Sequence, residues 1–261
     1  MARVSIATRE KAAAVIPPQA QGEVVSLALL AGPKQPIHLT QHDLGAHSRI
    51  TLTAGQADLA LFVWKGTVTA EGFELAEKSS AIIERGAALS LRAGGNGASV
   101  LVFSQGEPAQ DGKCGGKVHI LPGERVPRTA SLGGNEGVGG ALHADAACPT
   151  CSVWLHENSY AMAGKETPVH SHSEDEVIFV HSGSVRLGNR IYGPGTALAV
   201  AADTKYGFFS GPDGLGFVNF RARSPTYTSG DGRTVMDEAE LWRGLLGQPE
   251  YAEPAAPRTQ G

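Results

Sequence analysis

Short apolar segments rich in hydrophobic and β-branched residues recur along the chain, separated by glycine, proline or asparagine. Segments of this length and spacing predict short β-strands, and their regular succession indicates a sandwich or a closed barrel. In the first half the expected strands are Glu23–Leu30, Ser48–Thr53, Asp58–Trp64, Ala88–Leu91 and Ser99–Phe103. In the second half they are Ser152–His156, Glu176–His181, Val185–Leu187, Ala197–Val200 and Gly216–Arg221.

The two halves of the chain repeat one another. Residues 60–68 resemble residues 177–185, and residues 86–91 resemble residues 195–200. The first copy has the longer stretch between its two segments. A repeated strand, glycine turn and strand predicts an all-β fold of two related barrels that arose by internal duplication.

Three regions depart from the strand pattern. Residues 104–149 are rich in glycine, proline and polar residues, so we expect them to connect the halves, with a short strand at Lys117–Leu121. Val235–Leu246 has acidic residues at its start and apolar residues further on, which predicts a short helix packed on the outside of a barrel. Within it, Trp242 is expected to be a packing residue. Residues 248–261 are polar and contain proline, and we expect a flexible tail.

Composition narrows the class of protein. The chain of 261 residues is 41% hydrophobic, enough for a sizeable core, and its 34 glycines and 15 prolines favour many turns. A net charge of −4 argues against a nucleic-acid binder of the basic kind. No apolar run is long enough to span a membrane, and no apolar stretch of a signal peptide follows the first methionine. We expect a cytoplasmic protein without nucleic-acid or membrane partners.

The three cysteines are Cys114, Cys148 and Cys151, a number that does not suggest a disulfide framework. Cys148 and Cys151 form a C-x-x-C motif, which serves either as a redox pair or as half of a zinc site. A strand follows the motif where the redox class has a helix, and Cys114 with His119 or His143 is a poor second ligand pair. The favoured interpretation is a loop with reduced thiols.

His170, His172 and Glu176 are spaced as metal ligands on a β-hairpin. The two histidines are two residues apart, so on a strand they point to the same side. Three residues then allow a tight turn, after which Glu176 begins a second strand that folds back towards the imidazoles. Two neutral histidines and one carboxylate make a three-ligand site that can leave coordination positions open for water or substrate.

The same segment resembles the first motif of the cupin superfamily, G-x5-H-x-H-x3-E-x6-G. It fits Gly164, His170, His172, Glu176 and Gly183 without a gap. Together with the internal repeat, this resembles a two-domain cupin, or bicupin, over most of the chain. The resemblance implies two jelly-roll barrels, a metal bound by both histidines and the glutamate, and a homodimer formed through edge strands.

The first copy lacks the matching ligands. When the repeats are aligned on Gly66 and Gly183, the positions that correspond to the three ligands are Thr53, Gly55 and Leu59. Nearby histidines are not spaced for one strand face, so we expect surface or loop positions for His38, His42 and His47. We predict a degenerate, metal-free barrel at 1–115, a connecting segment at 116–150, a metal-binding barrel with helix at 151–247 and a tail at 248–261.

The second cupin motif, G-x5-P-x-G-x2-H-x3-N, is altered. Asp203 occupies the position of its second glycine, and Tyr206 falls where the family's fourth ligand, a histidine, would be. Tyr206 could bind the metal as a phenolate, hydrogen-bond a metal-bound water or substrate or act as an acid or base, or be a core aromatic. The candidate metal ligands are therefore His170, His172, Glu176 and Tyr206, with Tyr206 and Glu176 as candidate catalytic residues.

Four further residues are candidates for binding the metal or a substrate. His156 shares a strand face with Trp154 and is more often a satisfied barrel residue than a ligand. His181 is an odd number of positions from Glu176 and should face away from the metal. Arg221 and Arg223 could bind a substrate carboxylate, although surface positions are favoured.

The expected cofactor is one divalent transition metal, Fe, Mn, Ni, Co or Zn. Such a centre could bind O2 with substrate, as in a dioxygenase, or act as a Lewis acid in isomerase, decarboxylase or lyase chemistry. The leading hypothesis is a metal-dependent enzyme acting on a small organic acid or carbonyl compound. The alternative is a non-catalytic ligand-binding or structural module. A polar pocket beside the ligands would favour catalysis.

Overall fold

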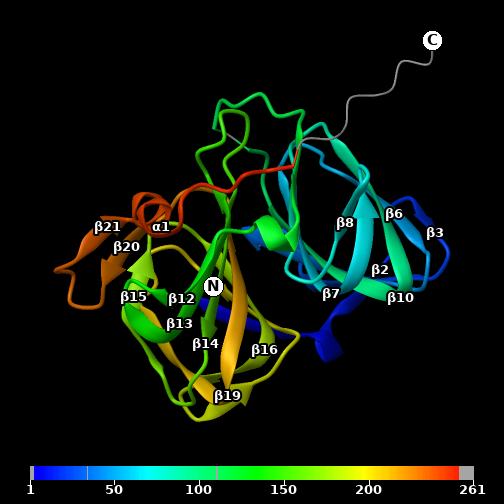
Figure 1. The fold of residues 1–261 in the computed structure, drawn as a ribbon. Coiled ribbons are helices and arrows are strands. Elements are labelled where there is room, and N and C mark those ends of the chain that lie inside the picture. Colours follow the sequence, from blue (N-terminus) through cyan, green and yellow to red (C-terminus); the bar gives the residue numbers. More distant parts are fainter. Residues whose placement is uncertain (1–2, 34, 110, 253–261) are drawn as a thin grey trace.

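The computed structural model describes residues 3–33, 35–109 and 111–252, which fold into two β-sheets, each curled into a barrel (Figure 1). The first barrel is a ten-stranded sheet with the central order β11-β9-β7-β10-β5-β4-β2. The second is an eleven-stranded sheet with the central order β1-β18-β16-β19-β14-β13-β12. One short helix follows near the C-terminal end, so the all-β jelly-roll prediction is confirmed.

The strands of the first barrel are β2 (Ala13–Val15), β3 (Ala20–Gln21), β4 (Val24–Leu30), β5 (Ile37–Leu44), β6 (Arg49–Thr53), β7 (Leu59–Ala70), β8 (Phe73–Leu75), β9 (Ser80–Ile83), β10 (Ala88–Gln105) and β11 (Val118–Leu121). Those of the second are β1 (Val4–Thr8), β12 (Arg128–Leu132), β13 (Asn135–Asp145), β14 (Trp154–Tyr160), β15 (Glu166–His172), β16 (Glu176–Leu187), β17 (Arg190–Tyr192), β18 (Thr196–Val200), β19 (Tyr206–Arg221), β20 (Thr226–Ser229) and β21 (Val235–Asp237). The helix is α1 (Glu238–Leu246), and the 3-10 helices are η1 (Arg9–Lys11) and η2 (Gly123–Arg125).

The two barrels exchange their first strands. β1 precedes the first barrel in sequence but pairs with β18 of the second, from Val4 opposite Val200 to Thr8 opposite Thr196. β11 precedes the strands β12 and β13 of the second barrel but pairs with β9 of the first. Each exchanged strand is followed by a 3-10 helix and then by an edge strand, β2 or β12. The structural repeat therefore begins earlier in each half, at β1 and β11, than the apolar segments that revealed it in the sequence.

This exchange corrects the expected boundaries. Residues 4–8 belong to the second sheet, so 1–115 is not a self-contained barrel. Residues 116–150 are more than a connection, because they contain β11, β12 and β13. The sequence pattern does not predict β13, because its glycines interrupt the run of apolar and β-branched residues that is typical of a strand. The expected tail is also wrong in part: the Tyr251 hydroxyl donates to the carbonyl of His143 at 3.1 Å, and Ala252 pairs with Ile120. Residues 253–261 lie outside the described part.

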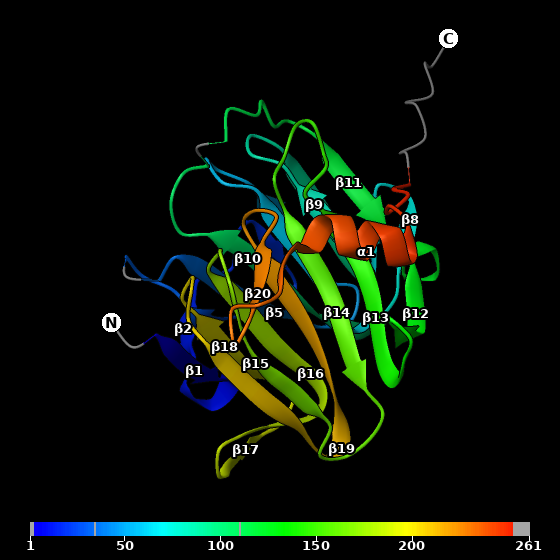
Figure 2. The ribbon, with the colours of Figure 1, turned by 90° about the vertical axis from the view of Figure 1, so that its left-hand side faces the viewer.

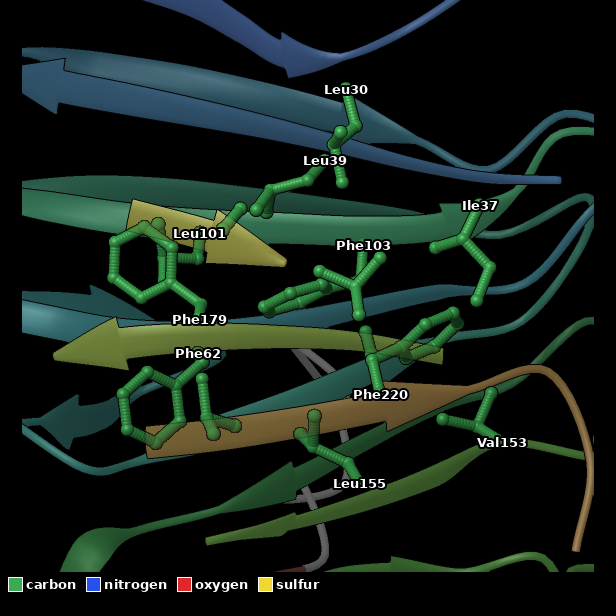
Figure 3. Packing of buried hydrophobic residues seen from close by; sticks show 14 of the residues in the cluster. Leu30, Ile37, Leu39, Phe62, Leu101, Phe103, Val153, Leu155, Phe179 and Phe220 are labelled. Atoms are coloured by element: carbon green, nitrogen blue, oxygen red, sulfur yellow. The ribbon is translucent and has the colours of Figure 1, made fainter. Parts of the chain in front are cut away.

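A continuous apolar core lies between the barrels (Figure 3). The first barrel contributes Phe62 and Phe103, and the second contributes Phe179 and Phe220, all at most 1% exposed. The rings of Phe103 and Phe220 stack across the boundary with centroids 5.5 Å apart. Burial of whole aromatic side chains is a large stabilising contribution, so each barrel completes the core of the other.

Strand alternation decides what the second barrel encloses. On β14 and β19, Leu155 and Phe220 belong to the shared core, whereas their neighbours His156, Asn219 and Arg221 line a cavity inside the second barrel. Successive side chains of a strand point to opposite faces. The same strands therefore anchor the barrel to its partner with one face and build the cavity with the other.

Replacing Phe103 with alanine should destabilise both barrels together. Deleting a buried phenylalanine ring costs roughly 3–5 kcal/mol. Because the core is shared, urea unfolding followed by tryptophan fluorescence and by circular dichroism should show one coincident transition, shifted by the substitution. Ile191→Ala, at a side chain that is 56% exposed, is the matched control and should change little. Two separate transitions, with only one of them moved by Phe103→Ala, would contradict a shared core.

Stability should also increase with pH because of His143, a fully buried residue of β13 whose Nδ1 lies 3.0 Å from Ser80 Oγ of β9. Burial lowers the pKa of His143 from 6.5 to about 4, with Glu157 opposing the shift. Between these values the unfolded chain binds a proton that the folded chain does not. The stability at stake, roughly 3 kcal/mol, is complete above pH 6.5 and is lost as the pH falls towards 4.

The measurement is the free energy of unfolding in urea across this pH range for the wild type and for His143→Gln. Glutamine can still bond Ser80 but does not titrate. The variant should show a flatter pH dependence. Equal slopes in the two proteins would exclude His143 as the source.

Candidate functional site

Three of the four sequence-predicted site residues, His170, His172 and Tyr206, line one cavity of about 390 Å³ inside the second barrel. His170 and His172 end β15, and Tyr206 begins β19 directly opposite His170. The ring of His170 lies between two tyrosines, with centroids 4.6 Å from Tyr206 and 5.2 Å from Tyr227. Other lining residues are His156, Asn158, Tyr160, Asn219, Arg221, Glu238 and Trp242.

The expected hairpin does not form. β15 pairs with β19 and β20, whereas β16 pairs with β17, β18 and β19. The three residues between His172 and Glu176 therefore link strands that are not neighbours. Glu176 is 1% exposed and is not among the residues lining the cavity. The β-hairpin that we inferred from the motif spacing is therefore wrong.

The buried carboxylate of Glu176 pairs with the guanidinium of Arg221. Its Nη2 donates to Glu176 Oε2 at 2.7 Å, and its Nη1 donates to Glu238 Oε2 at 2.9 Å. Asn219 Nδ2 also donates to Glu176 Oε2, at 2.7 Å. Arg221 is 1% exposed, so the expectation of a surface arginine is wrong. A buried charge needs a partner, and here the glutamate of the motif neutralises a guanidinium.

Several buried polar atoms around this pair have no hydrogen-bond partner within the described residues. They are Glu176 Oε1, His172 Nδ1, Asn219 Oδ1 and Arg221 Nε. Buried donors and acceptors are almost always paired, and unpaired ones cost free energy. Three of these atoms, on His172, Asn219 and Arg221, belong to residues that line the cavity, so a molecule bound there could pair them.

Burial sets the protonation states of the site. It lowers the pKa of both His170 and His172, so both imidazoles are neutral. Burial, with the charge of Glu176, raises the pKa of Tyr206 well above its usual 10, so the phenol keeps its proton. Burial opposes the charge of Arg221, but Glu238 and Glu176 outweigh it and raise the pKa of Arg221. Burial raises the pKa of Glu238 to about 6, against the attraction of Arg221.

Figure 2 shows α1 lying across β13 and β14. Residues of β21 and α1 line one side of the cavity, among them Met236, Glu238 and Leu241. Asp237 caps α1 by accepting hydrogen bonds from the backbone N–H groups of residues 239 and 240. The helix packs its Trp242 against Trp154, with centroids 6.4 Å apart, and brings Glu238 to within 3.5 Å of His172 Nδ1. Trp242 therefore packs as expected, but it also lines the cavity, and α1 contributes to the site as well as to packing.

The donor atoms as placed do not fit the metal predicted for this cavity. His170 has suitable chemistry: its Nδ1 donates to the carbonyl of Pro168 at 2.7 Å, which leaves the Nε2 lone pair free. However, His170, His172 and Glu176 do not form a group of donors within 4.8 Å of one another among the described residues. Glu176 faces a fixed guanidinium cation, and a neutral Tyr206 is a weak ligand. The role of His170, His172, Glu176 and Tyr206 as metal ligands stays a prediction.

Of the other histidines and arginines considered in the sequence, some lie where expected and others do not. His181 faces away from the cavity, with Nε2 3.3 Å from Glu157 Oε1 in the interface between the barrels. His156 lines the cavity but bonds Trp154 Nε1 at 2.8 Å. Arg223 is exposed. Of the first-barrel histidines, His47 is exposed as expected, but His42 is buried.

A different group meets the distance requirement of a metal site. Donor atoms of Glu84, His119, Cys148 and Cys151 all lie within 4.8 Å of one another. The sequence singled out the C-x-x-C pair but gave no signal for Glu84, which enters the group only through the pairing of β11 with β9.

Comparisons with known proteins place the fold. No protein-family model matches the sequence, and no curated protein matches it. Among solved structures, protein Ylba of E. coli has a TM-score of 0.67 at 14% identity, covering 84% of this chain and 90% of its own. A putative glyoxylate-induced protein of Pseudomonas aeruginosa has a TM-score of 0.68 at 13% identity, covering 84% and 88%. Oxalate decarboxylase of Lactobacillus farciminis, in a formate complex, has a TM-score of 0.66 at 9% identity, covering 87% and 88%.

These likenesses show that the chain has the cupin-type jelly-roll fold. Because the same fold hosts many activities, the function must be argued from the site. No helix in the described part of the chain is both long and apolar enough to cross a membrane.

Removing the Arg221 charge should be strongly destabilising. Arg221→Met leaves Glu176 and Glu238 buried without their cation, which costs roughly 3–5 kcal/mol. Adding Glu176→Gln should recover part of the loss, because one of the uncompensated charges disappears. Arg223→Met, at an exposed position two residues away, is the control and should change stability by less than about 0.5 kcal/mol. In urea unfolding, equal small effects of the two arginine substitutions would refute the buried ion pair.

Proposed function

We propose that the cavity of the second barrel is an active site for a small organic acid or carbonyl compound. The observation that carries this proposal is the group of unpaired polar atoms around the buried ion pair of Arg221 and Glu176. The cavity is open rather than plugged, and its mostly apolar wall carries a few polar side chains. Such a cavity, with a few convergent polar groups, is the usual form of a small-molecule site.

In this proposal the guanidinium of Arg221 supplies the positive charge that the motif led us to expect from a metal. A substrate oxygen that gains negative charge would bind beside Arg221 and the neutral phenol of Tyr206, which can both donate hydrogen bonds. Glu238, held next to Arg221 from α1, is the candidate proton acceptor. Proton transfer at a carbon next to a carbonyl group, as in isomerisation or lyase chemistry, suits this set of groups.

The competing candidate is the metal-dependent enzyme predicted from the sequence, as part of a bicupin. The Nε2 lone pair of His170 and the unpaired Nδ1 of His172 favour it. The two candidates differ in their response to His170→Gln and His172→Gln. If Arg221 carries the chemistry, the metal content of the purified full chain stays unchanged in both variants. Loss of a stoichiometric metal in either would favour the metal enzyme.

Ligand binding tests the proposal directly. We would screen small carboxylates and 2-oxo acids by calorimetry, beginning with oxalate and formate because the neighbouring structures include an oxalate decarboxylase and a formate complex. For a ligand that binds, Tyr206→Phe should weaken binding by roughly tenfold, the value of about one hydrogen bond. Tyr192→Phe, outside the cavity, should have no effect.

Turnover of the ligand by the wild type would make the site catalytic. Binding without turnover would support the alternative, a ligand-binding module. Binding that Tyr206→Phe leaves unchanged would remove the cavity from consideration.

A further inference from the structure

The second cluster of ligating side chains lies away from the cavity, in the angle between the two barrels. Glu84 directly follows β9, and His119 lies on β11, so both come from the first sheet. Cys148 and Cys151 lie in the loop that joins β13 to β14 of the second sheet. The four residues are therefore brought together only by the complete fold.

The spacing of the donor atoms suits a tetrahedral ion. Cys148 Sγ lies 3.4 Å from Glu84 Oε1 and 3.6 Å from His119 Nε2. Ligands about 2.0–2.3 Å from a tetrahedral zinc ion lie roughly 3.3–3.8 Å from one another. His119 Nε2 and Glu84 Oε1 are closer, at 2.7 Å, and would move apart slightly on binding an ion.

The surroundings hold the cluster in place. The backbone N–H of Lys117 donates to Glu84 Oε2 at 2.8 Å, and the Thr150 hydroxyl donates to Glu84 Oε1. The Lys113 ammonium donates to the carbonyls of Cys148 and Cys151 at 2.7 and 2.6 Å. This cation lies against the loop that carries both sulfurs, where it would balance the excess negative charge of two thiolates and a carboxylate around a divalent ion.

The carboxylate of Glu84 is itself buried, with 0% of the residue exposed. This enclosed carboxylate, two thiols and an imidazole are donors of the types that zinc takes in proteins.

We propose that Glu84, His119, Cys148 and Cys151 bind one zinc ion that joins the two barrels. Thiolate and imidazole ligands select zinc over magnesium or calcium, which prefer oxygen. Four protein ligands complete a tetrahedron, so the ion has a structural role with no position left for substrate. The C-x-x-C pair thereby gains the second ligand pair that a zinc site requires.

The test uses the full chain, reduced and freed of metal, and titrated with zinc or with cobalt(II) as a spectroscopic substitute. We expect one equivalent of either ion, a thiolate-to-cobalt charge-transfer band, and a higher melting temperature with zinc. The double variant Cys148→Ser, Cys151→Ser should abolish the band. It should also weaken zinc binding by more than roughly 100-fold, because loss of a residue that merely hydrogen-bonds to a ligand already costs roughly 10- to 100-fold. Cys114→Ser, at an exposed cysteine outside the group, should behave as the wild type.

Three outcomes would overturn the proposal. The first is a reduced wild-type chain that binds no zinc. The second is zinc binding that survives loss of both Cys148 and Cys151 but fails in His170→Gln, which would place the ion in the cavity. The third is a bound cobalt ion without a thiolate band in the wild type. That result needs no variant to fold.

Discussion

The apolar layer between the barrels is the constraint on which the rest of the structure depends. Phe103 of the first barrel and Phe220 of the second stack within it, so one face of β19 is committed to the partner barrel. Strand alternation then directs Asn219 and Arg221 into the second barrel's interior. The position of the cavity's charged groups is thus fixed by the packing on the opposite face of the same strand.

The exchange of first strands reinforces this dependence. β1 completes the second sheet and β11 completes the first, so neither repeat supplies its own outer strand. The same exchange carries His119 to the side of Glu84 and fixes it against the cysteine loop of the other barrel. An interface built for burial therefore also creates a ligand cluster that neither repeat contains alone.

Much of the fold could be predicted from the sequence because strand periodicity and glycine turns are local signals. Val177, Phe179 and their equivalents in the first copy revealed the repeat, and His170 and His172, which the motif singled out, line the cavity of the second barrel. The β15–β16 hairpin was wrong because a turn of three residues does not reveal which strands pair. Arg221 and Glu84 could not be assigned, since their burial depends on partners far away in the sequence.

The cavity of the second barrel and the group of possible metal ligands between the barrels have different chemical properties, which the motif alone did not suggest. In the cavity, Arg221 neutralises Glu176, and the histidines are neutral and enclosed. Between the barrels, sulfur, nitrogen and oxygen donors converge at the spacing a metal requires. The chain thus combines the cupin-type jelly-roll fold with a buried guanidinium in the wall of its cavity and a group of four possible metal ligands outside it.

The most direct test of this account is a crystal structure of the zinc-loaded chain with anomalous diffraction recorded at the zinc edge. We expect one strong anomalous peak bounded by Glu84, His119, Cys148 and Cys151, with the Arg221 guanidinium in contact with Glu176. A peak beside His170 and His172, with Arg221 displaced from Glu176, would contradict it.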